Sequence, residues 1–353
     1  MRRLILNIHL VIGLVAGVFV ILLGTTGSIL AFETELDRFL YRDTSYVKPG
    51  GKVLSLTEIG DAVSRKYPGE PVVAYLTPPA PDFPAGVILS RGIVLVDPYT
   101  GEVLGVRTRG PSFLGLVRAL HVQLAMGIIG RRVLDWCALA IVLSVLSGLY
   151  LWWPVKRMRI GGRLWSARFW YDLHSSLGFF SLVPVLLLAT TGTVIGFRDQ
   201  VEQLISRSTD AKTINSHEAT PIPRPEPGQG QISPDLAVSL ANAHLPGAVP
   251  YRVQMPQYGG FYVVALEFPQ NRINGKRNFI SLDPSTGRII ATRLSSDLTF
   301  SDRFMAANAT IHNCTIWGLP SRIVGAIASI LLPLQAVTGL LIWLRRKGIL
   351  RSN

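Results

Sequence analysis

Long apolar runs alternate with long polar segments along this chain. Four of the runs reach the length of about 20 residues that a membrane-spanning helix needs. Because the bilayer core offers no water to pair backbone N–H and C=O groups, we expect these runs to be α-helices. The predicted spans are Leu10–Ala31, Val133–Trp153, Leu173–Phe197 and Ile323–Leu344.

Each long polar segment has the pattern of a small α+β domain. A short helix is expected first, over Leu56–Tyr67 in one segment and Ser233–Leu245 in the other. Asp97-Pro-Tyr-Thr-Gly101 and Asp283-Pro-Ser-Thr-Gly287 predict hairpins, because Asp-Pro starts a turn and Gly accepts positive φ. Another short strand is expected after each turn. The strands expected before these turns are Val72–Leu76, Gly86–Leu89, Ile93–Val96, Tyr251–Met255, Phe261–Glu267 and Asn278–Leu282.

The chain also repeats itself without gaps. A shift of 165 residues aligns the first span with the third, and a shift of 191 aligns the second with the fourth. The predicted fold class is therefore membrane α-helical, with four transmembrane helices from an internal duplication and two small α+β domains outside. Matched residues include His9 with His174, Thr26-Gly27 with Thr191-Gly192, His121 with His312, Arg131 with Arg322, and Gly148 with Gly339.

Changes in composition mark the boundaries between these parts. Moderately apolar stretches at Ser112–Gly127 and Asp302–Gly318 are expected to be short helices at the outer interface. The expected division is a first span at 1–32, a first α+β domain at 33–111, an interfacial helix and second span at 112–154, a cytoplasmic loop at 155–170, a third span at 171–197, a second α+β domain at 198–301, an interfacial helix and fourth span at 302–344, and a tail at 345–353.

The charge of the chain fixes its expected orientation. The 353 residues are 48% apolar and 16% charged, with a formal net charge of +13. This excess does not indicate a nucleic-acid partner, because 33–118 and 198–311 are nearly balanced in charge. It lies beside the spans, at Arg2-Arg3, Lys156–Arg168 and Arg345–Arg351. By the positive-inside rule, both termini are cytoplasmic and the two α+β segments are outside.

Residues 1–30 also begin as a cleaved signal peptide would. The apolar run is longer than a typical signal-peptide core, and no clean small-x-small cleavage site follows it. Its repeat partner is an internal span. We therefore expect a retained membrane anchor.

Four of the six histidines stand at span boundaries and are paired by the repeat. His9 and His174 open the first and third spans, and His121 and His312 lie at the outer edge. Neutral imidazole binds iron, zinc or copper. Zinc usually takes four protein ligands, which the spans do not offer, whereas two histidines suit a haem. We expect two b-type haems per chain, bound non-covalently because no Cys-x-x-Cys-His occurs. The other two histidines, expected at the surface, are His217 and His244.

Small and basic residues extend this hypothesis. Gly13 and Gly178 lie on the histidine-bearing faces of their spans, where glycine would let a flat macrocycle approach the backbone. The alternative is helix packing through small residues. Arg131 and Arg322 lie just inside the outer boundary and are candidates to bind haem propionates. Their alternative role is to anchor lipid headgroups.

A set of short motifs covers nearly the whole chain. They are His9-xxx-Gly13, Thr26-Gly27, Asp97-Pro-x-Thr-Gly101, Ser147-Gly148-Leu-Tyr-Leu-Trp-Trp-Pro154, Asp172-Leu-His174-xxx-Gly178, Asp283-Pro-x-Thr-Gly287 and Thr338-Gly339-Leu-Leu-Ile-Trp343. With these motifs the spans resemble the PepSY-associated transmembrane family, and the outer segments resemble PepSY domains. The resemblance implies a bacterial inner-membrane protein of iron uptake, similar to haem-bearing reductases that act on ferric siderophores at the periplasmic side. It would make the four boundary histidines the haem ligands.

Three functions of different classes remain for this pattern. The leading hypothesis is an electron-transfer enzyme. Electrons from an unidentified cytoplasmic or membrane donor would pass from the inner haem to the outer haem and reduce a ferric siderophore or other Fe(III) chelate. The alternative is a PepSY-type periplasmic binding or protease-regulating membrane protein, which needs no membrane histidines. A transporter is disfavoured because the span midplanes lack charge, and only Asp135 lies inside a span.

Overall fold

The computed structural model describes residues 1–108, 112–154, 156, 160–161, 166–209, 230–257, 260–269 and 277–350. The chain divides into two compact units. The helical unit comprises Met1–Glu33, Pro111–Asp210 and Phe304–Asn353, and the sheet unit comprises Thr34–Gly110 and Ala211–Arg303. Most of the inner basic cluster, most of segment 206–232 and His217 lie outside the described residues.

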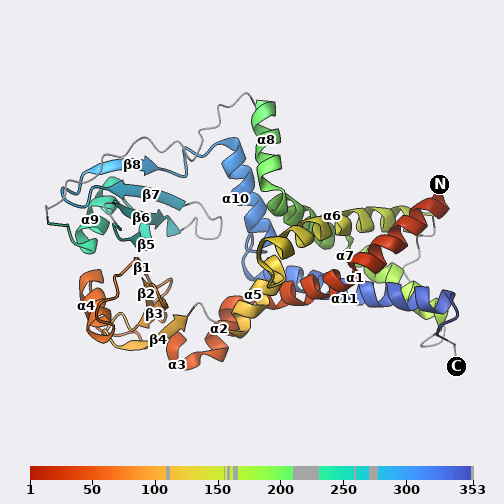
Figure 1. The fold of residues 1–353 in the computed structure, drawn as a ribbon, viewed down its shortest axis with the longest axis horizontal. Helices are drawn as coiled ribbons and strands as arrows, with labels where there is room; N and C mark the ends of the chain where they lie inside the picture. The colour runs from red at the N-terminus through yellow and green to blue at the C-terminus, as the bar shows by residue number, and fades with distance from the viewer. Residues whose placement is uncertain are drawn as a thin grey trace. The chain divides into compact units, whose positions relative to one another are not determined.

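Four helices of the helical unit are long and apolar enough to cross a membrane (Figure 1). All four predicted spans are confirmed as helices, and most extend a few residues beyond the predicted apolar run. The first and third helices each pack against the second and the fourth. Their bounds are α1 Arg2–Leu30, α6 Gly127–Trp152, α7 Ala167–Gly196 and α11 Leu319–Arg346.

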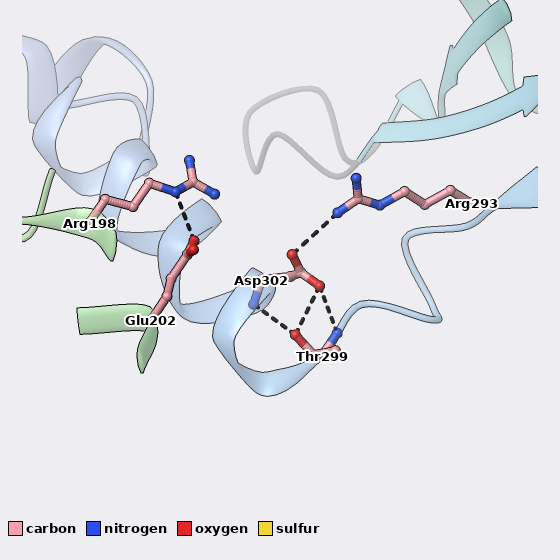
Figure 2. Close-up of polar contacts among 5 residues, drawn as sticks. All are labelled: Arg198, Glu202, Arg293, Thr299 and Asp302. Carbon is pink, nitrogen blue, oxygen red and sulfur yellow. Dashed lines mark hydrogen bonds and ion pairs between the residues drawn. The ribbon is translucent and has the colours of Figure 1, made fainter. Parts of the chain in front are cut away.

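Two shorter helices precede α6 and α11, as predicted. They are α5 (Phe113–Gln123) and α10 (Phe300–His312). The Ser112 side chain caps the start of α5. At the start of α10, Thr299 Oγ1 accepts from the Asp302 backbone N–H at 3.1 Å and donates to Asp302 Oδ2 at 2.9 Å (Figure 2). These caps satisfy otherwise unpaired N–H groups and fix where each helix starts, and thereby the position of the histidine in its last turn.

Three further helices follow the long helices α1 and α7 in the chain. They are α2 (Glu33–Leu40), α3 (Arg42–Ser45) and α8 (Arg198–Thr209), which follows α7. Within α8, Arg198 Nε donates to Glu202 at 2.7 Å, one helical turn away (Figure 2). Such exposed pairs contribute only a few tenths of a kcal/mol, about 0.3–0.5, so the ion pair is a minor support for this helix.

The middle of the helical unit packs through small and branched residues. Here α1 crosses α11 closely, because a Cβ added at Gly24 would lie 2.4 Å from the Ser329 carbonyl oxygen. Gly24 is therefore a packing glycine, of the kind that lets membrane helices approach. A buried cluster from the other three helices fills the same region and comprises Ile141, Val185, Ala189 and Ala328.

The sheet unit is built on one antiparallel sheet of eight strands in the order β4-β3-β2-β1-β5-β6-β7-β8. Each half is a helix followed by four consecutive strands, as predicted. However, β1 pairs with β5, with Tyr75 opposite Val253. The prediction of two small α+β domains is thus corrected to two halves of one sheet. The strand bounds are β1 Ala74–Leu76, β2 Ala85–Leu89, β3 Gly92–Val96, β4 Val103–Thr108, β5 Val249–Gln254, β6 Tyr262–Glu267, β7 Arg277–Leu282 and β8 Ile289–Arg293.

Two helices cover one face of this sheet (Figure 1). They are α4 (Leu56–Lys66) and α9 (Pro234–His244), and they contact each other. Asp235 of α9 accepts the backbone N–H groups of Leu56 at 2.7 Å and Thr57 at 2.9 Å. One half of the sheet unit therefore caps the helix of the other half, in addition to sharing one hydrophobic core with it.

The two predicted hairpin turns are confirmed. The Oδ1 atoms of Asp97 and Asp283 each accept the backbone N–H two residues later, at 2.8 Å and 2.9 Å. Gly101 and Gly287 have φ of +76° and +70°. The same turn therefore closes the third strand of each half.

Candidate cofactor-binding sites

The structure brings His9 of α1 and His174 of α7 together at one end of the bundle. Their ring centres are 6.3 Å apart and their ring planes are inclined by 77°. The two residues come from helices 165 positions apart in sequence, as the repeat predicted. We call this pair the inner site.

The proton of His9 is fixed by its neighbours on α6. His9 Nδ1 lies 3.1 Å from the Ser144 carbonyl oxygen and 3.0 Å from Ser147 Oγ. A carbonyl oxygen can only accept a hydrogen bond, so Nδ1 carries the proton. Nε2 then bears the free lone pair, which is the arrangement that a metal-binding histidine requires.

The proton of His174 is fixed in the same way by α11. His174 Nδ1 lies 2.9 Å from Thr338 Oγ1, and that hydroxyl donates to the Leu334 carbonyl oxygen at 2.7 Å. Because the hydroxyl proton is already used, Thr338 accepts from Nδ1–H. His174 therefore also presents a bare Nε2.

The other two histidines are anchored at the opposite ends of α1 and α7, and we call them the outer site. His121 Nδ1 lies 2.9 Å from Thr26 Oγ1, whose proton goes to the Leu22 carbonyl oxygen at 2.6 Å. His312 Nδ1 lies 3.0 Å from Thr191 Oγ1 and 3.2 Å from the Leu188 carbonyl oxygen. Among the described residues, neither Nε2 atom has a hydrogen-bond partner. The four imidazoles thus share one tautomer.

A hydroxyl residue followed by glycine recurs at all four histidines. The hydroxyl accepts from Nδ1–H, and the glycine leaves room for the ring, since an added Cβ would lie only 3.1–3.4 Å from the imidazole Cε1. The repeat already aligned these dipeptides, but their contact with the histidines was missed because it joins different helices. The dipeptides are Ser147-Gly148 at His9, Thr338-Gly339 at His174, Thr26-Gly27 at His121 and Thr191-Gly192 at His312.

The outer histidines both have lowered pKa values. Burial, and then repulsion from His312, lower the pKa of His121 to about 4. Burial also lowers the pKa of His312. Both rings are therefore neutral at physiological pH, the form in which imidazole binds a metal.

A cavity of about 970 Å³ opens around the inner site. It lies at the upper end of the size range for cofactor sites, roughly 300–1,000 Å³. Gly13 and Gly17 of α1 line it, and a Cβ added at either would meet nothing within 4 Å. Gly178 also lines it, but a Cβ added there would lie 3.4 Å from Gln335 Nε2. Gly13 and Gly17 thus border open space, unlike the packing glycine Gly24.

The two arginines expected near the outer histidines differ in their surroundings. Arg322 Nε donates to the Ala31 carbonyl oxygen at 2.7 Å, and its guanidinium lies over the Phe32 ring at 5.1 Å. Arg131 is exposed on α6, and no hydrogen bond or ion pair joins it to the outer histidines within the described part of the chain. His244 is exposed at the end of α9, as predicted.

The ligand set at each site is small. Among the residues that the structure describes, no group of three or more His, Cys, Asp or Glu side chains could hold a metal ion. Cys137 and Cys314 are both free thiols. Each site therefore offers two imidazole nitrogens.

Comparison with known proteins places the whole chain in one family. The model of the PepSY-associated TM region matches residues 6–346. This range includes both histidine pairs and all four long helices apart from the first four residues of α1. A search of curated proteins finds no match. With four helices able to span a membrane and a family match over nearly its full length, this multi-pass membrane protein belongs to the PepSY-associated transmembrane family.

Proposed function

We propose that this protein carries electrons across the bacterial inner membrane by means of two b-type haems and reduces a ferric siderophore or a similar Fe(III) chelate in the periplasm. The observation that carries the proposal is the anchoring of the four boundary histidines. Each donates Nδ1–H to a hydroxyl or carbonyl oxygen and keeps Nε2 free. Ordinary packing does not require this one tautomer at four repeat-related positions.

The spacing of His9 and His174 would suit a group held by two imidazole nitrogens. A metal held between two imidazole nitrogens at about 2.0–2.1 Å each separates the ring centres by roughly 6 Å, close to the observed 6.3 Å. The ≈ 970 Å³ cavity and the open sides of Gly13 and Gly17 leave room for a planar macrocycle. A haem bound here would supply a one-electron couple. The histidines would set its position, and their Nδ1–H donation would strengthen Nε2 as a ligand.

The two sites divide the distance across the membrane. His9 and Thr26 are 17 residues apart on α1, which corresponds to about 25 Å along the helix axis. The hydrocarbon core is roughly 30 Å thick, so the histidine pairs stand near its two faces. The outer pair would lie on the periplasmic side if the basic clusters are cytoplasmic. There, one electron per iron converts Fe(III) to Fe(II), which binds the hard oxygen ligands of a siderophore more weakly.

Four single substitutions test this proposal. We expect purified wild-type protein to contain two low-spin haems per chain in a pyridine-haemochrome assay. His9→Ala and His174→Ala should remove the same haem, and His121→Ala and His312→Ala should remove the other, because each haem loses an axial ligand. The exposed His244 provides the control, and His244→Ala should leave both haems in place.

The same variants test the reaction. Membrane vesicles given a reductant on the cytoplasmic side should reduce an external ferric siderophore, and all four site variants should lose this activity while His244→Ala keeps it. Clearly fewer than one haem per chain in haem-replete cells would contradict the proposal and favour a PepSY-type binding protein. So would variants with unchanged spectra and reduction rates.

A further inference from the structure

Four arginines gather at the mouth of the inner cavity. Arg2 and Arg3 begin α1, and Arg345 and Arg346 end α11, so the fold brings together residues from the two ends of the chain. All four line the ≈ 970 Å³ cavity that also holds His9 and His174. The sequence shows them only as parts of two separate basic clusters.

Little negative charge balances the positive charge of these four arginines. None of the described residues that line the cavity is acidic. Arg2 donates to the Leu151 carbonyl oxygen at 3.3 Å. Arg345 Nε is buried and has no hydrogen-bond partner in the described structure. A buried guanidinium N–H without a partner costs free energy, about 1–3 kcal/mol or more for a charged group, which indicates that an anion completes this site.

The position of the arginines identifies the anion. Arg2 precedes His9 by seven residues. Arg345 follows Gly339 by six residues, and Gly339 lies beside the His174 ring. At 1.5 Å per residue, the arginines lie about 9–11 Å beyond the histidines along the helices. They therefore border the edge of the cavity, not its centre. A ligand held at the centre by two imidazoles would meet them with peripheral acidic groups.

We propose that Arg2, Arg3, Arg345 and Arg346 bind the carboxylates of the inner cofactor, that is, the two propionates of the inner haem. This inference rests on the proposed function. Arginine suits the role because its planar guanidinium binds a carboxylate through two parallel hydrogen bonds. The same chemistry would bind lipid phosphate, so the experiment separates the two sources. This cluster is separate from Arg131 and Arg322, which are the candidate propionate ligands at the outer boundary.

The test compares haem with its dimethyl ester, which keeps the ring and the iron but has no carboxylates. Full-length apoprotein in zwitterionic nanodiscs is titrated with each ligand, with the outer site removed by His121→Ala and His312→Ala. We expect the ester to bind about tenfold or more weakly than haem. Arg345→Gln with Arg346→Gln should abolish this preference by weakening haem binding alone. Lys347→Gln, which removes a charge of the same tail outside the cavity lining, should keep it.

Each other outcome counts against the inference. If a variant bound haem and the ester more weakly to the same extent, the arginines would act in folding and not in carboxylate binding. Arg2→Gln with Arg3→Gln, whose helix content is checked by circular dichroism, would then provide a second measurement of the preference. A preference that persists in both arginine pairs would place the carboxylates elsewhere. A preference that appears only with anionic lipids would assign the cluster to headgroups. Absence of haem binding by the starting protein would overturn the proposed function itself.

Discussion

At the scale of single residues, the informative feature is the hydroxyl that receives each histidine proton. A comparison of Thr26 with its exposed neighbour Thr25 shows how specific this contact is. Both hydroxyls donate to a carbonyl oxygen one turn earlier on α1, at 2.6 Å and 2.8 Å. Only Thr26 also accepts from a histidine, His121. Two adjacent threonines therefore form a natural test pair for the role of the hydrogen bond.

Thr26→Val should weaken outer haem binding about tenfold or more, as loss of such a supporting hydrogen bond typically does. Valine keeps the shape of threonine, but His121 Nδ1–H loses its acceptor and the ring loses its fixed orientation. Titration of the apoprotein and the midpoint potential of the outer haem would measure the effect. Thr25→Val should behave as the wild type does. Equal effects of the two changes would show that Thr26 acts on α1 and not on His121.

At the scale of elements, α1 uses glycine for two different purposes along one helix. Near its middle, Gly24 lets α11 approach within contact distance. One to two turns from His9, Gly13 and Gly17 border the cavity instead. Residue type alone does not separate these roles, because small residues favour both helix packing and close approach of a ligand.

Gly17→Leu and Gly24→Leu should therefore fail in different ways. A leucine at position 17 enters open space, so the apoprotein should keep its thermal unfolding temperature while the inner haem content falls. A leucine at position 24 meets the Ser329 carbonyl oxygen, so the bundle should lose about 1–3 kcal/mol of stability or more. Thermal unfolding of both apoproteins and their haem content would check this. A loss of apoprotein stability in Gly17→Leu comparable with that in Gly24→Leu would contradict the cavity assignment.

The elements themselves were largely predictable from the sequence. The spans follow from apolar runs, and the strands follow from local patterns, with an Asp-Pro turn between the third and fourth strand of each half. What the pattern could not show is contact between distant segments. The pairing of Tyr75 with Val253, and of His174 with Thr338, joins residues more than 160 positions apart. The histidines were found because the repeat marks them, whereas their hydroxyl partners lie on helices that only the fold brings alongside.

At the scale of the whole molecule, the shared sheet constrains the topology of the chain. β1 and β5 form one hydrogen-bonded ladder, so the strands of the two polar segments lie on the same side of the membrane. Four spans, with these segments after the first and third, require the same arrangement. The distribution of basic residues predicts which side this is, because the start of α1 and the end of α11 carry arginines and the positive-inside rule expects them in the cytoplasm. The sheet and the charges are independent observations that agree.

Cysteine labelling in intact cells would measure this topology. Thr100 and Thr286 occupy equivalent, exposed positions in the two hairpin turns, and Lys347 is exposed at the end of α11. In a chain whose Cys137 and Cys314 are replaced by serine, Thr100→Cys and Thr286→Cys should react with a membrane-impermeant maleimide once the outer membrane is opened. Lys347→Cys should react only after the inner membrane is made permeable. Protection of both turn cysteines would reverse the orientation and place the outer histidines at the cytoplasmic face. Labelling of only one of them would be incompatible with the β1–β5 pairing, because the two turns belong to the same sheet.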